Sequence, residues 1–208
     1  MEQTMLLHKA PRTESLDGVE PLWLEYKHPM SAPDARAQVA VRVGWNEQAM
    51  LVRFDVESDH LRVKCLKPGE AVCKDTCVEF FFATPTGGYR NLEVNAIGTH
   101  LFHAQPTQRQ WPHHRLDWLI EPPMVRSSLP YEGVLPERPG PVSFRVDVQL
   151  PWRLMGRDIA PLPGDVLPCN FYHCADHARL PRWISWSPVE GLLNFHRPAC
   201  FGTVMFTD

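Results

Sequence analysis

Alternation of apolar and polar residues is the feature that most limits how this chain can fold. Residues 143–150 are apolar at every even position and polar at every odd one, and residues 51–57 place Val52, Phe54 and Val56 on one face. A period of two directs alternate side chains to opposite faces of a β-strand. Shorter runs of this kind predict strands at 38–43, 77–82, 89–95, 118–121, 170–174 and 203–206. The chain is therefore expected to consist mainly of strands.

Proline is the second constraint, because 21 of the 208 residues are proline and this residue breaks helices and central strands alike. Only residues 151–155, which begin Pro-Trp, predict a short helix. Residues 103–115 and 126–141 have the composition of loops. Residues 77–82 and 89–95 flank a proline- and glycine-containing turn, so they predict an antiparallel hairpin.

Together these patterns predict an all-β fold, an antiparallel β-sandwich with at most one or two short helices. The sequence has no internal repeat and no low-complexity tract, so one domain is expected over residues 1–208.

Charge and hydropathy exclude several classes of partner. A net charge of −3 removes the basic surface that nucleic-acid binding needs, and no run approaches the roughly 20 apolar residues of a membrane span. The first residues carry no signal peptide, so the chain as written is expected to be cytoplasmic, or exported if a leader was trimmed. The six cysteines are then expected to be free thiols rather than three disulfides. The oligomeric state stays open.

The predicted hairpin places a row of polar side chains on one sheet face. If Val78, Phe80, Leu92 and Val94 point to the core, the opposite face carries Cys77, Glu79, Asn91, Glu93 and Asn95. The strand at 143–150 adds Arg145 if it belongs to the same sheet. Carboxylates, amides and an arginine in one plane suit a ligand rich in hydroxyl groups. The alternative is that an antiparallel sheet simply has one solvated side.

Tryptophan supplies the stacking surface that sugar rings use, and the chain contains seven. Trp111, in a polar loop rich in proline, is the tryptophan least expected in the core. Trp183 and Trp186 flank Ser185 beside a loop and are compatible with either role.

Metal and nucleophile motifs are weak. The spacings Cys169-x4-Cys174-x2-His177 and Cys73-x3-Cys77 are not the paired C-x2-C knuckles of structural zinc, so no metal is expected. Cys77 or Cys174 with His196 as base would suit a nucleophilic enzyme, but the sequence does not bring them together.

Six segments in order resemble a known family: KDTCVEFF (74–81), YRNLEVNAIGT (89–99), NFYHCAD (170–176), SW (185–186), NFHRP (194–198) and FG (201–202). In order and spacing the chain is similar to the carbohydrate-binding family 9-like proteins, relatives of the family 9 carbohydrate-binding modules of xylanases. The resemblance implies a jelly-roll-like β-sandwich, related to the DOMON group of sugar- and haem-binding domains.

The resemblance is incomplete at two places. In the xylan-associated modules two tryptophans clamp a terminal sugar, and here residues 71–74 provide none, unless Trp111 or Trp118 supplies it from another loop. The family modules also carry structural calcium, for which Glu57 and Asp59 are a thin cluster. No cofactor is therefore expected, with calcium as the one alternative.

The sequence thus predicts a carbohydrate-binding protein without catalytic activity. Trp111 and Trp186 are expected to stack on the sugar, and His196 with Arg197 to shape the rim, although Arg197 could instead pair with Glu79 or Glu93. The complete predicted site is Glu79, Asn91, Glu93, Asn95, Trp111, Arg145, Trp186, His196 and Arg197.

Two other functions stay open. One is a haem-b electron carrier, for which Met124, Met155, His100 and His103 are the available axial ligands. The other is an enzyme on a sugar derivative that uses Glu79 and Glu93, because retaining glycoside chemistry needs two carboxylates about 5 Å apart.

Overall fold

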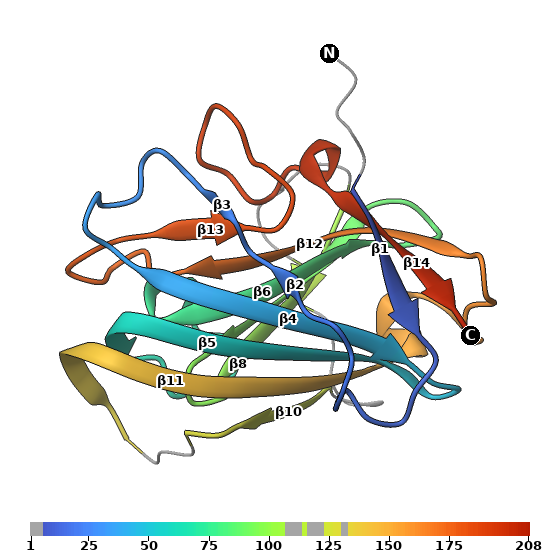
Figure 1. The fold of residues 1–208 in the computed structure, drawn as a ribbon, viewed down its shortest axis with the longest axis horizontal. Coiled ribbons are helices and arrows are strands. Elements are labelled where there is room, and N and C mark those ends of the chain that lie inside the picture. The colour runs from blue at the N-terminus through green and yellow to red at the C-terminus, as the bar shows by residue number, and fades with distance from the viewer. Residues whose placement is uncertain (1–5, 107–113, 116–122, 130–132) are drawn as a thin grey trace.

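The chain folds into two packed β-sheets, which Figure 1 shows as two layers of long strands. The structure is a computed structural model, and it describes residues 6–106, 114–115, 123–129 and 133–208. Among the described strands, β1 pairs with β14 in parallel and all other strand pairs are antiparallel. One isolated bridge outside these strands, between Arg12 and Trp45, is also parallel. The predicted all-β sandwich is confirmed.

The larger sheet has nine described strands, in the order β1-β14-β12-β6-β7-β8-β9, with β13 paired to β12 and β3 paired to β13. Their bounds are β1 Leu7–Pro11, β3 Tyr26–Lys27, β6 Cys77–Ala83, β7 Tyr89–Asn95, β8 His100–Gln105, β9 His114–Arg115, β12 Val166–Cys174, β13 Trp183–Ser185 and β14 Gly202–Thr207.

The smaller sheet has five described strands, in the order β10-β11-β5-β4-β2. Their bounds are β2 Leu22–Trp23, β4 Ala37–Trp45, β5 Ala49–Val63, β10 Met124–Ser127 and β11 Leu135–Pro151. Three short 3-10 helices complete the described elements, at Val72–Lys74, Trp152–Met155 and Pro198–Cys200. The second is the helix that the sequence predicted; the other two were not predicted.

The main core fills the space between the sheets. Phe171 on β12 stacks on Phe80 of β6 at 4.9 Å between ring centroids, and it meets Phe54 of β5 edge-on at 6.1 Å. Val78 and Leu92 lie in the same cluster, as the alternation predicted. The period-two pattern therefore assigned the inner faces of β5, β6, β7 and β11 correctly.

The proline-rich segment 126–141 differs from its prediction as a loop, because β11 already begins at Leu135. Pro136 and Pro141 lie at two register shifts in the pairing of β11 with β5. Among the described residues, β10 pairs with β11 only at 146–149, so the other edge of this stretch has no described partner. Proline is tolerated at such bulges and edges because no ladder hydrogen bond is lost there.

The predicted loop at 103–115 is also partly wrong. β8 continues to Gln105, and β9 covers His114–Arg115. The strand predicted at 118–121 lies outside the described residues. Within the part of the chain that the structure describes, no helix has the length and hydropathy that a membrane span requires. All six cysteines are free thiols, as expected.

A buried arginine ties the two sheets together at one end. Arg182 is fully buried and donates through Nε to Nε2 of His173 on β12 at 3.0 Å, and through Nη2 to the Ser58 hydroxyl on β5 at 2.6 Å. Burial first, and then the Arg182 charge, hold the pKa of His173 well below its ordinary value. His173 is therefore a neutral acceptor in the folded protein.

This contact predicts a loss of stability in acid. Below about pH 6.5 the unfolded chain protonates His173 while the folded chain does not, so the free energy of unfolding falls as the pH is lowered. A His173→Gln variant should flatten that slope by up to about 1.4 kcal/mol per pH unit between pH 6.5 and 5. Urea unfolding at several pH values measures the slope. Equal slopes in the two proteins would contradict the account, and His177→Gln, at an exposed position, is the control.

Candidate functional site

The polar row predicted on the hairpin exists, but it is not solvated. Cys77 and Glu79 on β6 share the outer face of the larger sheet with Asn91, Glu93 and Asn95 on β7, as predicted. Glu79 and Glu93 are direct cross-strand partners, yet they are only 3% and 6% exposed. Both faces of these central strands are therefore buried.

Two segments roof this face. The loop from 64 to 76 and the segment from 186 to 201 fold over β6, β7 and β12. They build a second apolar cluster whose buried members are Val72, Cys77, Phe81, Tyr89, Leu101, Tyr172, Cys174, Val189, Phe195, Cys200 and Phe201. This cluster replaces solvent on the outer face of the sheet.

A buried carboxylate anchors the first of these segments. Asp75 is fully buried and accepts hydrogen bonds from Nη1 of Arg62 at 2.5 Å and from the backbone N–H groups of Lys64 and Cys65. The Nδ2 of Asn95 donates to the same carboxylate at 3.1 Å. The predicted ligand residue Asn95 is thus a structural group beneath the loop.

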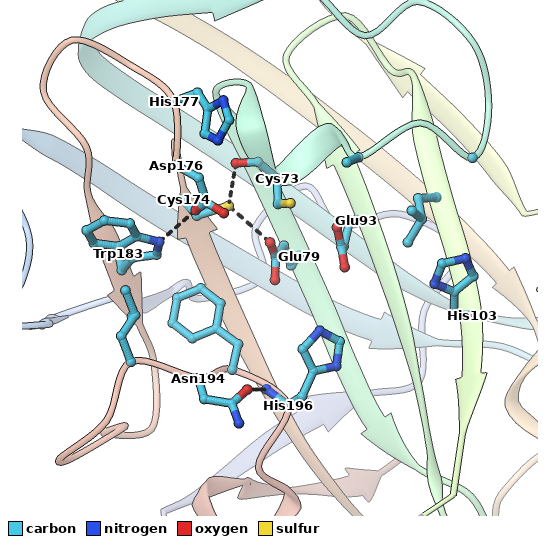
Figure 2. A pocket seen from close by; sticks show the side chains of 15 residues that line it. Cys73, Glu79, Glu93, His103, Cys174, Asp176, His177, Trp183, Asn194 and His196 are labelled. Atoms are coloured by element: carbon cyan, nitrogen blue, oxygen red, sulfur yellow. Dashed lines mark hydrogen bonds between the residues drawn. The ribbon is translucent and has the colours of Figure 1, made fainter. Parts of the chain in front are cut away.

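A pocket of about 550 Å³ opens where the two segments meet (Figure 2), which is within the usual 300–1,000 Å³ of small-ligand sites. Its lining comes from β6, β7, β8, β12 and β13 and from both roofing segments. The described lining residues are Gly69, Ala71, Cys73, Glu79, Glu93, Leu101, His103, Cys174, Asp176, His177, Trp183, Leu193, Asn194, Phe195 and His196.

The floor of the pocket is acidic. The Cys174 thiol donates to Oε1 of Glu79 at 3.0 Å, and Nδ2 of Asn91 donates to Oε1 of Glu93 at 3.0 Å. The described lining contains no lysine or arginine. Burial first, and then the charges of Glu93 and Glu79, raise the pKa of Cys73, so this thiol is protonated at neutral pH.

One wall of the pocket is aromatic. The indole N–H of Trp183 donates to Oδ1 of Asp176 at 2.7 Å, and the two side chains lie together in Figure 2. Burial raises the pKa of Asp176, although the Trp183 hydrogen bond opposes the shift. Across the pocket, the His196 ring lies 2.9 Å from the Tyr89 hydroxyl through Nδ1, and its backbone N–H donates to Asn194.

The structure brings three of the nine predicted site residues into the pocket: Glu79, Glu93 and His196. Asn91 lies behind Glu93 as its hydrogen-bond donor. Trp186 is half-buried and packs against Phe171 of the main core, with its ring directly over Gly202. Trp111 lies outside the described residues.

Two predicted arginines do not reach the carboxylates. The prediction that Arg145 shares the Glu79 and Glu93 face is wrong, because β11 belongs to the other sheet, where Arg145 pairs with Asp55 at 2.7 Å. Arg197 donates to the backbone carbonyl of Glu190 at 2.7 Å and so fixes its own segment.

The pocket also contains residues that were not predicted as sugar ligands, above all His103, Asp176, Trp183 and Asn194. Trp183 was a tryptophan whose role the sequence left open. Asp176 is the last residue of the 170–176 segment that carried the family resemblance. His103 was assigned to a loop, and only the pairing of β8 with β7 directs it into the pocket.

The residues considered for haem do not gather at one site, and one of the two considered for calcium already faces an arginine. Asp59 lies 3.5 Å from the Arg182 guanidinium. Of the four haem-ligand candidates only His103 lines the pocket; Met155 is in the main core and Met124 is exposed on β10.

The fold and the site define a class: β-sandwich proteins that carry a small-ligand pocket on the outer face of one sheet. The sequence pattern of carbohydrate-binding family 9 matches residues 22–206, and the chain belongs to that family. No match was found among curated proteins.

Solved structures agree with this assignment. A protein from Bacteroides uniformis ATCC 8492, proposed to bind carbohydrate, is 25% identical with a TM-score of 0.83, over 97% of this chain and 98% of that one. A family 9 module from Caldicellulosiruptor kristjanssonii in complex with cellotriose is 13% identical (TM-score 0.65, 97% and 94% covered). A family 9 module from the same organism in complex with glucose is 12% identical, with a TM-score of 0.64, over 97% of this chain and 96% of that one. The latter two show the shared fold.

The Asp75 anchor predicts a large cost for its removal. Asp75→Ala leaves the Arg62 guanidinium buried without its carboxylate, which should lower the free energy of unfolding by about 3–5 kcal/mol. Asp147→Ala is the matched control, since Asp147 forms an ion pair with Arg53 at a half-exposed site and should cost about 0–1 kcal/mol. Denaturant unfolding of both variants measures the difference. Similar small losses would show that Asp75 does not hold the loop.

Proposed function

We propose that the protein binds a neutral carbohydrate, without catalysis, in the pocket on the outer face of the larger sheet. The observation that carries the proposal is the joint presence of two carboxylates on the floor and an indole on one wall. Sugar hydroxyls donate to carboxylates, and the C–H face of a pyranose packs on an aromatic ring.

Family membership supports the same reading. Related family 9 modules have been solved with cellotriose and with glucose. Those modules share only 12–13% of their residues with this chain, so the ligand of this pocket depends on its own residues.

The charge of the lining narrows the class of sugar. Glu79, Glu93 and Asp176 surround the space, and the described lining offers no lysine or arginine to a negative group. Placing like charges together in a desolvated site costs several kcal/mol. We therefore propose a neutral sugar rather than a uronic acid as the ligand.

The alternative function is a sugar-processing enzyme. The two carboxylates that it would need are present as neighbours, because Glu79 on β6 is the cross-strand partner of Glu93 on β7. Binding is the better-supported function because family 9 modules of the same fold have been solved in complex with cellotriose and with glucose.

The test is calorimetric titration with glucose, cellotriose and a wider panel of neutral oligosaccharides. Trp183→Ala should weaken the binding of the best ligand by about 10- to 150-fold, which corresponds to the loss of about 1.5–3 kcal/mol of buried aromatic contact. Trp23→Ala is the matched control, because Trp23 is 50% exposed on the other sheet and outside the pocket.

Three results would contradict the proposal. They are the absence of heat with every neutral sugar, an equal loss in the two tryptophan variants, and equal affinity for glucose and glucuronic acid. Recovery of the ligand unchanged after titration separates binding from catalysis.

A further inference from the structure

Two thiols and a carboxylate converge at the inner end of the pocket. The ligand atoms of Cys77, Glu79 and Cys174, two sulfurs and one oxygen, all lie within 4.8 Å of one another, and the three residues are buried. Among the described residues, these three side chains form the one group of cysteine, histidine or acidic residues close enough together to share a metal ion.

The sheet itself sets this geometry. Cys77 and Glu79 are two residues apart on β6 and so point to the same face, and Cys174 on β12 is the direct cross-strand partner of Cys77. A constellation on paired central strands is held more precisely than one on loops. The three ligands are therefore placed before any ion arrives.

We propose that Cys77, Glu79 and Cys174 bind one zinc ion at the floor of the pocket. Two thiolates and one carboxylate are ligands that zinc accepts, with bonds of about 2.3 Å to sulfur and about 2.0–2.2 Å to oxygen. The presence of two sulfurs disfavours calcium and magnesium, which take oxygen ligands.

The fourth position of a tetrahedral ion would face the pocket. Glu79 and Cys174 line the pocket directly, and Figure 2 shows Cys73 beside them. The Cys73 backbone carbonyl accepts a hydrogen bond from the Cys174 thiol at 3.5 Å. A water from the pocket would complete the coordination as the fourth ligand.

Binding of the ion exchanges protons for metal. Without metal, the Cys174 thiol donates a hydrogen bond to Glu79, and the Cys77 thiol donates to the Val78 carbonyl oxygen at 3.5 Å. Zinc would therefore displace one proton from each of the two thiols to solvent, while sulfur is neither oxidised nor reduced. The apparent affinity must then rise with pH, because two protons leave for each ion bound.

The zinc site shares Glu79 with the proposed sugar pocket, but its ligand set follows from the sheet geometry whether or not a sugar binds. It departs from the sequence expectation of no metal, because the three ligands come from positions 77, 79 and 174, whose spacing matches no zinc motif. Cross-strand pairing alone brings them together.

The test uses cobalt as a spectroscopic probe on the full chain, reduced and stripped of metal. One equivalent of Co²⁺ should produce thiolate-to-cobalt charge-transfer absorption with tetrahedral ligand-field bands, and Zn²⁺ should displace it. Cys174→Ala should remove most of this absorption and weaken metal binding by about 100-fold or more, beyond the 10- to 100-fold typical of outer-shell changes. Cys169→Ala, at another buried cysteine of β12, is the matched control and should retain the spectrum.

Glu79→Gln provides a second variant if Cys174→Ala does not fold. It keeps both sulfurs, so charge-transfer absorption should persist while the affinity falls and the ligand-field bands shift. The proposal is overturned if cobalt gives no thiolate absorption, or if that absorption survives both Cys77→Ala and Cys174→Ala, since other cysteines would then be the ligands. Loss of sugar binding in Trp183→Ala with an intact cobalt spectrum would separate the two sites.

Discussion

The buried carboxylate of Asp75 is the interaction on which the pocket depends. The carboxylate is fully buried. It accepts hydrogen bonds from the Arg62 guanidinium, from two backbone N–H groups and from the Asn95 amide. Those partners come from β5, from the loop that follows it and from the end of β7. A paired and hydrogen-bonded buried charge strongly resists removal of one partner. The loop that carries Cys73 and Ala71 to the pocket rim is therefore fixed to the sheet.

The consequence is a sheet that is buried on both faces at its centre. One face of β6 and β7 packs in the sandwich, and the other lies under the two roofing segments. Polar groups on the roofed face have little water to compete for them, so their mutual interactions are strengthened. The roofed face thus holds two facing carboxylates, each with its own side-chain hydrogen-bond donor, beside thiols whose pKa is raised by burial.

Sequence patterning predicted the strands and their faces, but not how the strands are arranged in the two sheets. Alternation identified the long strands and the row from Cys77 to Asn95, because a period of two is a local property of the chain. It could not decide to which sheet β11 belongs, and so Arg145 was misplaced beside Glu79. Nor could it reveal that a loop covers the row, since that depends on the distant contact of Arg62 with Asp75.

The same limit explains the missed pocket residues. Cys174 reaches the site through the pairing of β12 with β6, in which its partner Cys77 is 97 residues away in the chain. Trp183 reaches it through the pairing of β13 with β12. The prolines of 136–141 predicted a loop because proline is rare inside strands. They fit within β11 only because its pairing with β5 shifts register there, which the sequence does not reveal. The family resemblance identified the fold and the segments, but the chain's own contacts define which of their side chains face a ligand.

The most direct measurement of the central claim is a map of amide chemical-shift changes on titration with the best neutral sugar. The account predicts changes concentrated at 71–75, 174–177 and 193–196, the segments around the pocket. Changes centred on Trp23 and Arg145, on the outer face of the smaller sheet, would contradict it and move the binding site to the other side of the molecule.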